Sequence, residues 1–387
     1  MELRKEFVRA DARREEDLSE LCRRYGISRV TGYKWRERYQ QGGERALDDV
    51  SRAPHHSPQA IGEDTAETIL QLRREHPRWG PKKLGAYLEA HHSQTKWPAN
   101  SSIGALLERE GLSTHRPKRA RTPAYTQPLA HAEGPNQVWS VDFKGWFRCG
   151  DGTRCDPLTL TDGFSRYLLR ARLVEKTDGE HARAVLEAAF RQYGMPVAIR
   201  SDNGAPFASK APAGLSRLSM WWLRLGIVHE RIDPGCPEQN GRHERMHQTL
   251  RQEVASPPAA HWRAQQQALL RFEHSYNFER PHEALGQRTP GELYTASQRA
   301  YPSRLPELAY PDDVADYRRI STGGELRWKG DKVFVSEVLE QQTVGLREVE
   351  QDWFEVFYGT VLLGHLDGHA RRFAATAPKR RRRKPKT

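Results

Sequence analysis

Three acidic residues in separate segments could act together on a phosphodiester. Asp142 lies in VWSVDFKG, Asp202 in RSDNGAPF and Glu244 in PEQNGRHERMHQTLRQE. Carboxylate oxygens without a thiol ligand suit Mg²⁺ or Mn²⁺. Two such ions would activate a nucleophilic oxygen and stabilise the leaving oxygen of a phosphodiester. The three segments therefore predict an acidic site for two Mg²⁺ or Mn²⁺ ions, provided that the fold brings them together.

The third segment offers two candidate glutamates, Glu238 and Glu244. Asn240 can cap a helix that starts at Gly241, so Glu244 lies in the first helical turn and Glu238 in the preceding loop. Helical spacing separates a buried stripe from an opposite polar face. The stripe is Met246, Leu250 and Val254, and the polar face is Glu244, Gln248 and Arg251. The rigid position of Glu244 makes it the better candidate for the third carboxylate.

Each aspartate is expected at the end of a strand. Val141 and Phe143 point away from Asp142 in an alternating strand, so its carboxylate leaves the apolar face. Asp202 follows the apolar run VAIR and precedes the turn residues Asn203 and Gly204. Ligands of open α/β sheets gather at strand ends. For Asp202 an ordinary Asp-Asn-Gly turn is a strong alternative.

Two histidines beside Glu244 raise the possibility of a zinc site. His243 and His247 are four residues apart, but the glutamate that an HExxH motif requires between them is missing. We therefore expect both histidines to contact DNA or solvent. The four cysteines form no CxxC pair and predict neither a zinc ribbon nor a disulfide framework.

The bulk composition favours an intracellular protein with a polyanionic partner. A chain of 387 residues is long enough for several domains, and its formal charge of +12 is typical of nucleic-acid binding. The N-terminal segment has no apolar signal core, and no stretch approaches the length of a membrane span. We expect a soluble cytoplasmic protein that associates with DNA.

The first 113 residues predict two small helical DNA-binding domains, 1–57 and 58–113. Residues 17–25 and 29–39 read as two helices that are joined by a turn at Gly26, with Ser28 as an N-cap. An exposed helix in any small bundle would give the same pattern. The second domain repeats the theme around HPRWGPKKL. The expected DNA contacts of the two domains are Arg29, Tyr33, Lys34, Lys82 and Lys83.

The remainder predicts an α/β core followed by a small β domain. Alternating strands and helices indicate a mixed sheet that is covered by helices. A run of short strands after the core favours a small β-barrel. The expected order is a basic linker at 114–135, the core at 136–295, a second linker at 296–322, the barrel at 323–373 and a basic tail at 374–387.

Together, and in this order, the three acidic segments resemble the DDE catalytic core of bacterial insertion-sequence transposases, relatives of retroviral integrases with an RNase H-like fold. GISRVTGYKWRERY and HPRWGPKKL resemble the tandem helix-turn-helix units that precede that core. YNFERPHEALGQRTPGELY resembles its closing segment. The resemblance covers nearly the whole chain.

The resemblance implies residue roles. Its catalytic, metal-binding triad falls on Asp142, Asp202 and Glu244, with Asn203, Gly204, Asn240, Gly241 and Gln248 in support. Arg242 and Arg245 would bind phosphates. It implies a transposase that recognises terminal inverted repeats, cleaves the element ends, joins the 3′-OH to target DNA and acts as at least a dimer, in a bacterial cytoplasm at the nucleoid. The alternatives are a DNA-binding regulator with an inactive core and an RNase H-type nuclease.

Overall fold

The structure is a computed structural model that describes residues 2–49, 60–113, 132–233 and 235–375. It divides into two compact units, residues 1–62 and 63–387. The segment APHHSPQ, most of the expected basic linker and the basic tail lie outside the described residues. The side chain of Glu238 is not among those described either.

The first unit is a helical bundle with a helix-turn-helix. Its helices are α1 (Glu2–Ala12), α2 (Leu18–Arg24), α3 (Arg29–Gly42) and a short 3-10 turn, η1 (Gly43–Leu47). Asp17 and Ser28 cap α2 and α3 with their side chains, as expected of Ser28. Gly26 adopts a φ of 65° in the turn between these helices. Trp35 and Tyr39 of α3 pack against the core around Phe7, which confirms the inner face that the sequence predicted.

The second unit begins with three more helices. They are α4 (Glu63–Glu75), α5 (Pro81–His91) and α6 (Asn100–Arg109). Pro81 occupies the first turn of α5, where its missing N–H costs no hydrogen bond. Ile69, Leu84 and Ile103, one from each helix, are fully buried. The three helices predicted for this part of the chain are therefore present.

A mixed sheet forms the centre of the second unit. Its strands are β1 (Val138–Phe143), β2 (Phe147–Arg148), β3 (Arg154–Asp162), β4 (Leu168–Val174), β5 (Ala198–Ser201) and β6 (Val228–Arg231). Strands β2, β3 and β1 are antiparallel neighbours, whereas β1, β5 and β6 run parallel. Strand β4 pairs with β3 away from this path. These connections give the α/β core that the sequence predicted.

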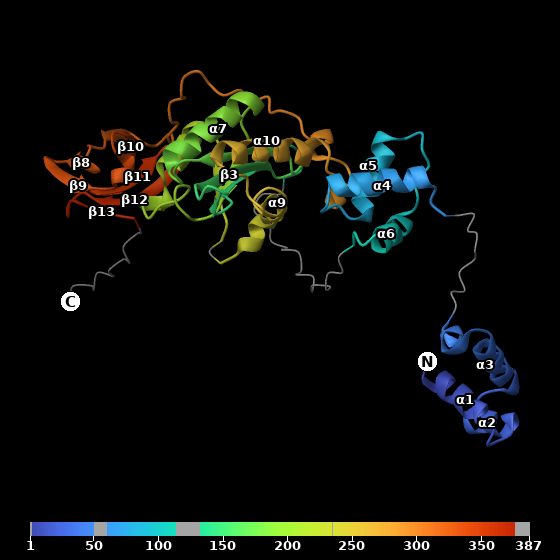
Figure 1. Ribbon diagram of the computed structural model, residues 1–387. Coiled ribbons are helices and arrows are strands. Elements are labelled where there is room, and N and C mark those ends of the chain that lie inside the picture. Colours follow the sequence, from blue (N-terminus) through green and yellow to red (C-terminus); the bar gives the residue numbers. More distant parts are fainter. Residues whose placement is uncertain (1, 50–59, 114–131, 234, 376–387) are drawn as a thin grey trace, which may run out of the picture. The chain divides into compact units, whose positions relative to one another are not determined.

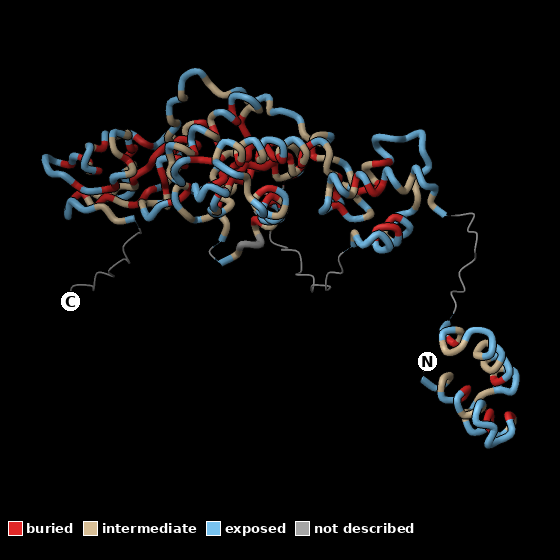
Figure 2. Tube along the Cα trace, viewed as in Figure 1, coloured by how far each residue is buried: buried red, intermediate tan, exposed pale blue. Residues whose placement is uncertain are grey.

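Helices cover both faces of this sheet (Figure 1). Helices α7 (Gly179–Tyr193) and α8 (Arg217–Arg224) share one apolar cluster with Val141 and Leu160. Helices α9 (Gly241–Glu253) and α10 (Trp262–Phe278) share another cluster with Cys155 and Leu168. The buried positions follow the sheet and the inner sides of the helices (Figure 2). Because strand side chains alternate, Asp142 lies on the face opposite Val141, toward α9.

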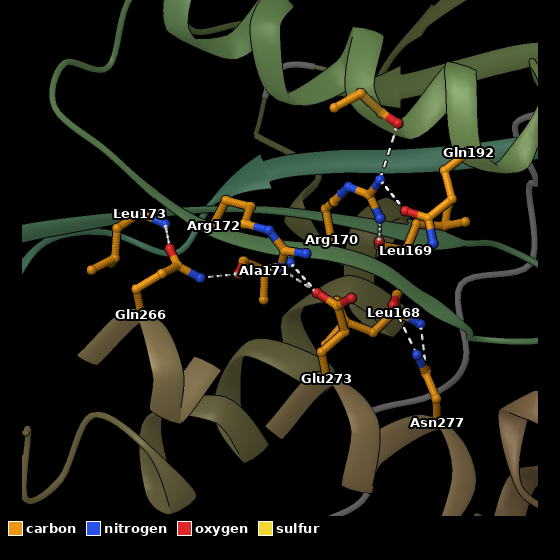
Figure 3. A network of polar contacts seen from close by, with 11 residues as sticks. Leu168, Leu169, Arg170, Ala171, Arg172, Leu173, Gln192, Gln266, Glu273 and Asn277 are labelled. Atoms are coloured by element: carbon orange, nitrogen blue, oxygen red, sulfur yellow. Dashed lines mark hydrogen bonds and ion pairs between the residues drawn. The ribbon is translucent and has the colours of Figure 1, made fainter. Parts of the chain in front are cut away.

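Side chains of α10 satisfy the outer backbone edge of β4 (Figure 3). Gln266 accepts a 2.7 Å hydrogen bond from the Leu173 N–H, and Asn277 both accepts from and donates to Leu168. Glu273 accepts from the Ala171 N–H and pairs with Arg172. An open strand edge invites pairing with other chains. Helix α10, which the sequence analysis did not identify, therefore covers this edge.

The C-terminal part contains two sheets. One has the order β13-β12-β11-β10-β7 and the other pairs β8 with β9. Their strands are β7 (Asp316–Arg319), β8 (Glu325–Trp328), β9 (Asp331–Phe334), β10 (Thr343–Glu350), β11 (Trp353–Tyr358), β12 (Val361–Asp367) and β13 (Arg372–Ala374).

Neither of these sheets closes among the described strands, so the predicted β-barrel is not shown. Strand β7 lies inside segment 296–322, which was expected to be a linker. The β domain also shares its apolar cluster with Leu215 and Met220, at the start of α8 and within it. Its core is therefore completed by the α/β domain, a dependence that strand periodicity does not reveal.

The role of α10 at the β4 edge predicts a difference between two adjacent glutamines. Replacing Gln266 by Ala leaves the buried-edge Leu173 N–H without its partner, which costs about 1–3 kcal/mol. Gln267→Ala changes an exposed neighbour on the same helix and is expected to cost less than about 0.5 kcal/mol. Urea unfolding measures both. Equal losses in the two variants would contradict the role of Gln266.

Candidate functional site

Parallel pairing of β1 and β5 brings the two aspartates to the same level. Ser140 is the register partner of Arg200, and each aspartate lies two residues further along its strand direction. Asp142 is therefore the next-to-last residue of β1, and Asp202 directly follows the last residue of β5. This is the carboxyl end of two adjacent parallel strands, where sheets of this class place their ligands.

The turn after Asp202 shapes the space for its carboxylate. The Gly204 N–H donates to Asp202 Oδ1 at 3.0 Å, and a Cβ at position 204 would lie 3.1 Å from Asp202 Oδ2. Asn203 Nδ2 donates to the Ile232 carbonyl at 2.6 Å and so ties the turn to the end of β6. Asn203 and Gly204 therefore fix the conformation of the turn that carries Asp202.

Helix α9 presents Glu244 from its first turn. Met246, Leu250 and Val254 are buried and Glu244, Gln248 and Arg251 are exposed, as the sequence predicted. Asn240 occupies the N-cap position before Gly241, but its side chain makes no capping hydrogen bond. Glu244 lines a surface pocket of about 420 Å³, whose other lining residues are Lys144, Gly241, Arg245, His247, Gln248 and Arg251.

The negative charges of Asp202 and Glu244 act on the buried carboxyl of Asp142. Burial, followed by the negative charge of Asp202 and more weakly that of Glu244, raises the pKa of Asp142 from its ordinary 3.8 to about 7. A hydrogen bond from the Phe143 backbone and the charge of Lys144 oppose this rise. A buried carboxylate near two other carboxylates carries negative charge that is not compensated. A divalent cation, which binds oxygen ligands, would neutralise this charge.

His243 and His247 are buried and bond to threonine hydroxyls, so our expectation of solvent-facing rings was wrong. They are 1% and 8% exposed, and they face β3 from α9. His243 Nδ1 lies 2.7 Å from Thr161 Oγ1, and both Nε2 atoms lie within 2.7 Å of Thr159 Oγ1. Burial lowers the pKa of His243 well below its usual range and that of His247 to about 3. Both rings are therefore neutral at pH 7.

Hydrogen-bond valence assigns the tautomers of both rings. Thr159 Oγ1 donates its only hydrogen to the Asp142 carbonyl at 3.1 Å. It can then only accept from the two histidines, so both carry their hydrogen on Nε2. His247 Nδ1 is then unprotonated, and it lies 3.8 Å from Asp142 Oδ2. The network fastens α9, and with it Glu244, to the strand beside Asp142.

A similar hydroxyl–imidazole pair holds Asp202. Ser201 Oγ donates to the Asp202 carbonyl at 2.9 Å and lies 2.8 Å from Nε2 of His229. Burial lowers the pKa of His229 to about 4, so this ring is also neutral at pH 7. The sequence did not point to Thr159, Thr161, Ser201 or His229, and it suggested the wrong environment for His243 and His247. Helical spacing could have found the histidines, because His243 and His247 fall on the stripe of Met246 and Leu250.

The predicted DNA contacts have different environments. Arg29, Tyr33 and Lys34 are exposed on α3. In contrast, Lys82 pairs with Glu283, and half-buried Lys83 donates to the Pro281 carbonyl. Burial lowers the pKa of Lys83 to about 8. Arg242 and Arg245 are both exposed on α9, and Arg242 donates to the Gly163 carbonyl at 2.6 Å.

The carboxylates are neighbours but do not form a finished metal site. Among residues 2–49, 60–113, 132–233 and 235–375, no group of three or more His, Cys, Asp or Glu side chains is spaced to hold a metal ion. In the same part of the chain, no helix combines the length and apolar character that a membrane crossing requires.

Comparison with protein families gives four matches along the chain. Models described as integrase core domains match residues 132–237 and 225–290. A helix-turn-helix model matches residues 3–55, and a homeodomain-like model matches residues 31–107. A protein of insertion element IS407 from Burkholderia multivorans is 29% identical over 264 residues, which cover 67% of this chain and 89% of that protein. The chain belongs to the insertion-sequence transposases of the retroviral integrase superfamily.

Two other relatives extend the same pattern. The transposase InsD of insertion element IS2D from Escherichia coli K12 is 28% identical, with 59% of this chain and 79% of InsD covered. A protein of insertion element IS476 from Xanthomonas euvesicatoria is 27% identical, with 58% of this chain covered. The chain spans 63% of that protein, slightly less than two thirds.

Solved integrase structures align only loosely with this transposase. The HTLV-2 integrase catalytic core in complex with magnesium gives a TM-score of 0.34 at 16% identity, covering 42% of this chain and 99% of that core. A simian T-cell lymphotropic virus intasome in complex with a PP2A regulatory subunit gives 0.37 at 18% identity, covering 76% and 97%. At these TM-scores the superpositions add nothing to the assignment.

The family matches include every residue of the predicted triad. Asp142 and Asp202 lie in the first integrase core match, and Glu244 lies in the second. The transposase has helix-turn-helix domains that bind DNA and an integrase-like core.

The raised pKa of Asp142 predicts a pH-dependent effect of removing its charge. The folded protein must ionise this buried carboxyl as pH rises from about 4 to about 7, and this cost is complete above pH 7. Asp142→Asn is therefore expected to stabilise the metal-free protein more at pH 8 than at pH 5, by about 2–3 kcal/mol. Urea unfolding in EDTA at both pH values measures this difference.

Asp312→Asn, which changes an exposed aspartate, is the control for the loss of one negative charge. It is expected to show the same small effect at both pH values. If Asp142→Asn also had the same effect at pH 5 and pH 8, the carboxyl of Asp142 would not be buried among negative charges.

The shared hydroxyl of Thr159 predicts a large difference between two substitutions. Thr159→Val keeps the shape but leaves two buried imidazole N–H groups without an acceptor, which costs at least ~2 kcal/mol. Thr159→Ser keeps the hydroxyl and is expected to lose no more than about 1 kcal/mol. Urea unfolding at pH 7 compares the two. Equal losses would show that the hydroxyl does not hold α9 in place.

Proposed function

We propose that this transposase cleaves the ends of an insertion sequence and joins the freed 3′-OH ends to target DNA. Asp142, Asp202 and Glu244 would hold two Mg²⁺ or Mn²⁺ ions at the carboxyl ends of β1 and β5. The observation that carries this proposal is the electrostatic coupling of Asp142 to Asp202 and Glu244, from two parallel strands and the first turn of α9. Integrase core matches over all three residues support it.

The chemistry consists of two displacements at phosphorus. In the first, water attacks a phosphodiester at the element end, so a P–O bond forms and the bond to the element's 3′ oxygen breaks. In the second, this 3′-OH attacks a phosphodiester of target DNA and releases a target 3′-OH. Bound divalent ions would lower the pKa of the attacking oxygen and neutralise charge on the leaving oxygen. No co-reactant other than water is consumed.

The residues of the chain then have separable tasks. The Thr159–His243–His247 network and the Ser201–His229 pair hold the backbone that carries the carboxylates. Lys144, Arg245 and Arg251, which line the pocket of Glu244, would face the phosphates of the DNA. Arginines suit this task because their planar fork matches phosphate oxygens.

The helical domains would bring the core to its substrate. Arg29, Tyr33 and Lys34 lie exposed on the second helix of the helix-turn-helix, where that motif contacts base edges. We propose that they recognise the terminal inverted repeats. Pairing two element ends requires two such proteins, so the active form would be at least a dimer.

The main alternative is a DNA-binding regulator with an inactive core. It shares the helix-turn-helix domains but needs no acidic site. The charge repulsion at Asp142 counts against it, because a burial that raises the pKa of this carboxyl to about 7 has no structural benefit on its own.

A strand-transfer assay with a terminal-repeat duplex tests the proposal. In Mg²⁺ the wild type is expected to cleave and join the duplex. Glu244→Gln is expected to bind the duplex with unchanged affinity and to lose at least ~100-fold in joined product. Replacing a residue that only supports a metal ligand already costs up to about 100-fold in activity, and loss of the ligand itself should cost at least as much. The double variant Tyr33→Ala/Lys34→Ala is expected to show the opposite defect, weaker binding of the duplex with the core intact.

Two results would contradict the proposal. A wild type that binds the duplex but never cleaves or joins it would be a regulator. Full activity of Glu244→Gln together with inactivity of Glu238→Gln would move the third carboxylate to Glu238.

A further inference from the structure

A second, larger pocket lies on the other side of the first turn of α9. Its volume is about 580 Å³, and three of its lining residues are arginines, whereas none is acidic. It is lined by Ala132, Phe164, Arg166, Arg242, Ala284, Leu285, Gly286, Arg288 and Leu293. Glu244 and Arg242 are two residues apart on α9 but line different pockets, so the helix separates this pocket from the carboxylates.

The turn between β3 and β4 fixes the position of Arg166. Asp162 is 1% exposed and accepts hydrogen bonds from the backbone N–H of Asn136 and from the N–H and hydroxyl of Ser165. These bonds hold the turn so that Arg166 has a φ of 63°. A left-handed conformation costs a residue with a Cβ about 1 kcal/mol or more. The turn thus carries a strained backbone at the arginine of the pocket.

The arginines of this pocket lack acidic partners. Among the described residues, no carboxylate lies within ion-pair distance of Arg166, Arg242 or Arg288. Burial, and after it the positive charges of Arg242 and Arg245, lower the pKa of Arg166. The next arginines along the chain differ, because Arg172 pairs with Glu273 and Arg170 donates to Gln192. Arg166 is half-buried, whereas Arg242 and Arg288 are exposed. Three guanidinium groups thus line one pocket that contains no acidic residue, which favours an anionic ligand.

We propose that the pocket of Arg166, Arg242 and Arg288 binds a backbone phosphate of the DNA on which the transposase acts. The proposal rests on the proposed function, because it takes DNA as the substrate of the core. Guanidinium groups bind phosphate oxygens in a bidentate manner, and a pocket open to solvent admits a continuous strand. The positive end of the helix dipole of α9 adds to the attraction.

The pocket and the carboxylates would then contact successive parts of one DNA strand. Arg242 is held by the Gly163 carbonyl, which leaves its other N–H groups for a ligand. Arg166 and Arg288 come from the β3–β4 turn and from the loop after α10. A phosphate bound by all three would couple these two segments to the helix that carries Glu244 and so fix the register of the strand beside the acidic site.

The salt dependence of DNA binding tests this pocket. The experiment uses the full chain and a fluorescent terminal-repeat duplex, with the affinity measured at several salt concentrations. Each lost phosphate contact lowers the slope of log K against log salt by about 0.9. Because the arginines are proposed to contact the same phosphate, the variant Arg166→Asn/Arg288→Gln is expected to lower the magnitude of the slope by about 0.9. Asn tolerates the left-handed backbone at position 166. Arg271→Gln, an exposed arginine of α10, is the control for the loss of charge and should leave the slope unchanged.

The outcomes separate this proposal from the proposed function. Thermal unfolding by circular dichroism checks that the double variant folds, and Arg166→Lys/Arg288→Lys, which keeps the charge, should restore most of the slope. If the wild type binds, cleaves and joins DNA while the folded double variant keeps the wild-type slope, the pocket does not hold a phosphate. If the wild type does not bind the duplex, both proposals fail.

Discussion

The attachment of α9 to β3 through buried polar groups is the constraint on which the acidic site depends. The buried imidazole N–H groups of His243 and His247 both donate to the hydroxyl of Thr159, so hydrogen bonds as well as apolar packing fix the helix on the sheet. That hydroxyl also donates to the carbonyl of Asp142. One side chain therefore relates the backbone of the first aspartate to the helix that carries Glu244.

This arrangement explains why the histidines are neutral. Both ring nitrogens of His243 face threonine hydroxyls and not a carboxylate, so a charged ring would gain no ion pair in return for its burial. Burial disfavours the charged ring for the same reason. The positive charge that the carboxylates lack is thus not supplied by these rings. Lys144 supplies part of it, and divalent cations are the proposed source of the rest.

The arginines of the core fall into two groups with different physical roles. Arg172 and Arg200 pair with Glu273 and Glu230 and hold strands and helices together. Arg166, Arg242 and Arg288 line a pocket that contains no acidic residue. A net charge of +12 alone does not distinguish these groups. The difference lies in which acidic side chains the fold places beside each arginine.

The sequence by itself determined the order of the domains, most strands and helices of the core, the exposed face of α9 and the choice of its candidate carboxylate. These features depend on local periodicity and capping, which neighbouring residues encode. The tertiary structure decided that His243 and His247 donate to Thr159, that α10 covers the edge of β4, and that the C-terminal strands pack on α8 as open sheets. It also brought Arg166 beside Arg242. Each of these depends on contacts between segments far apart in the chain, such as Thr159 with His247, for which local spacing carries no signal.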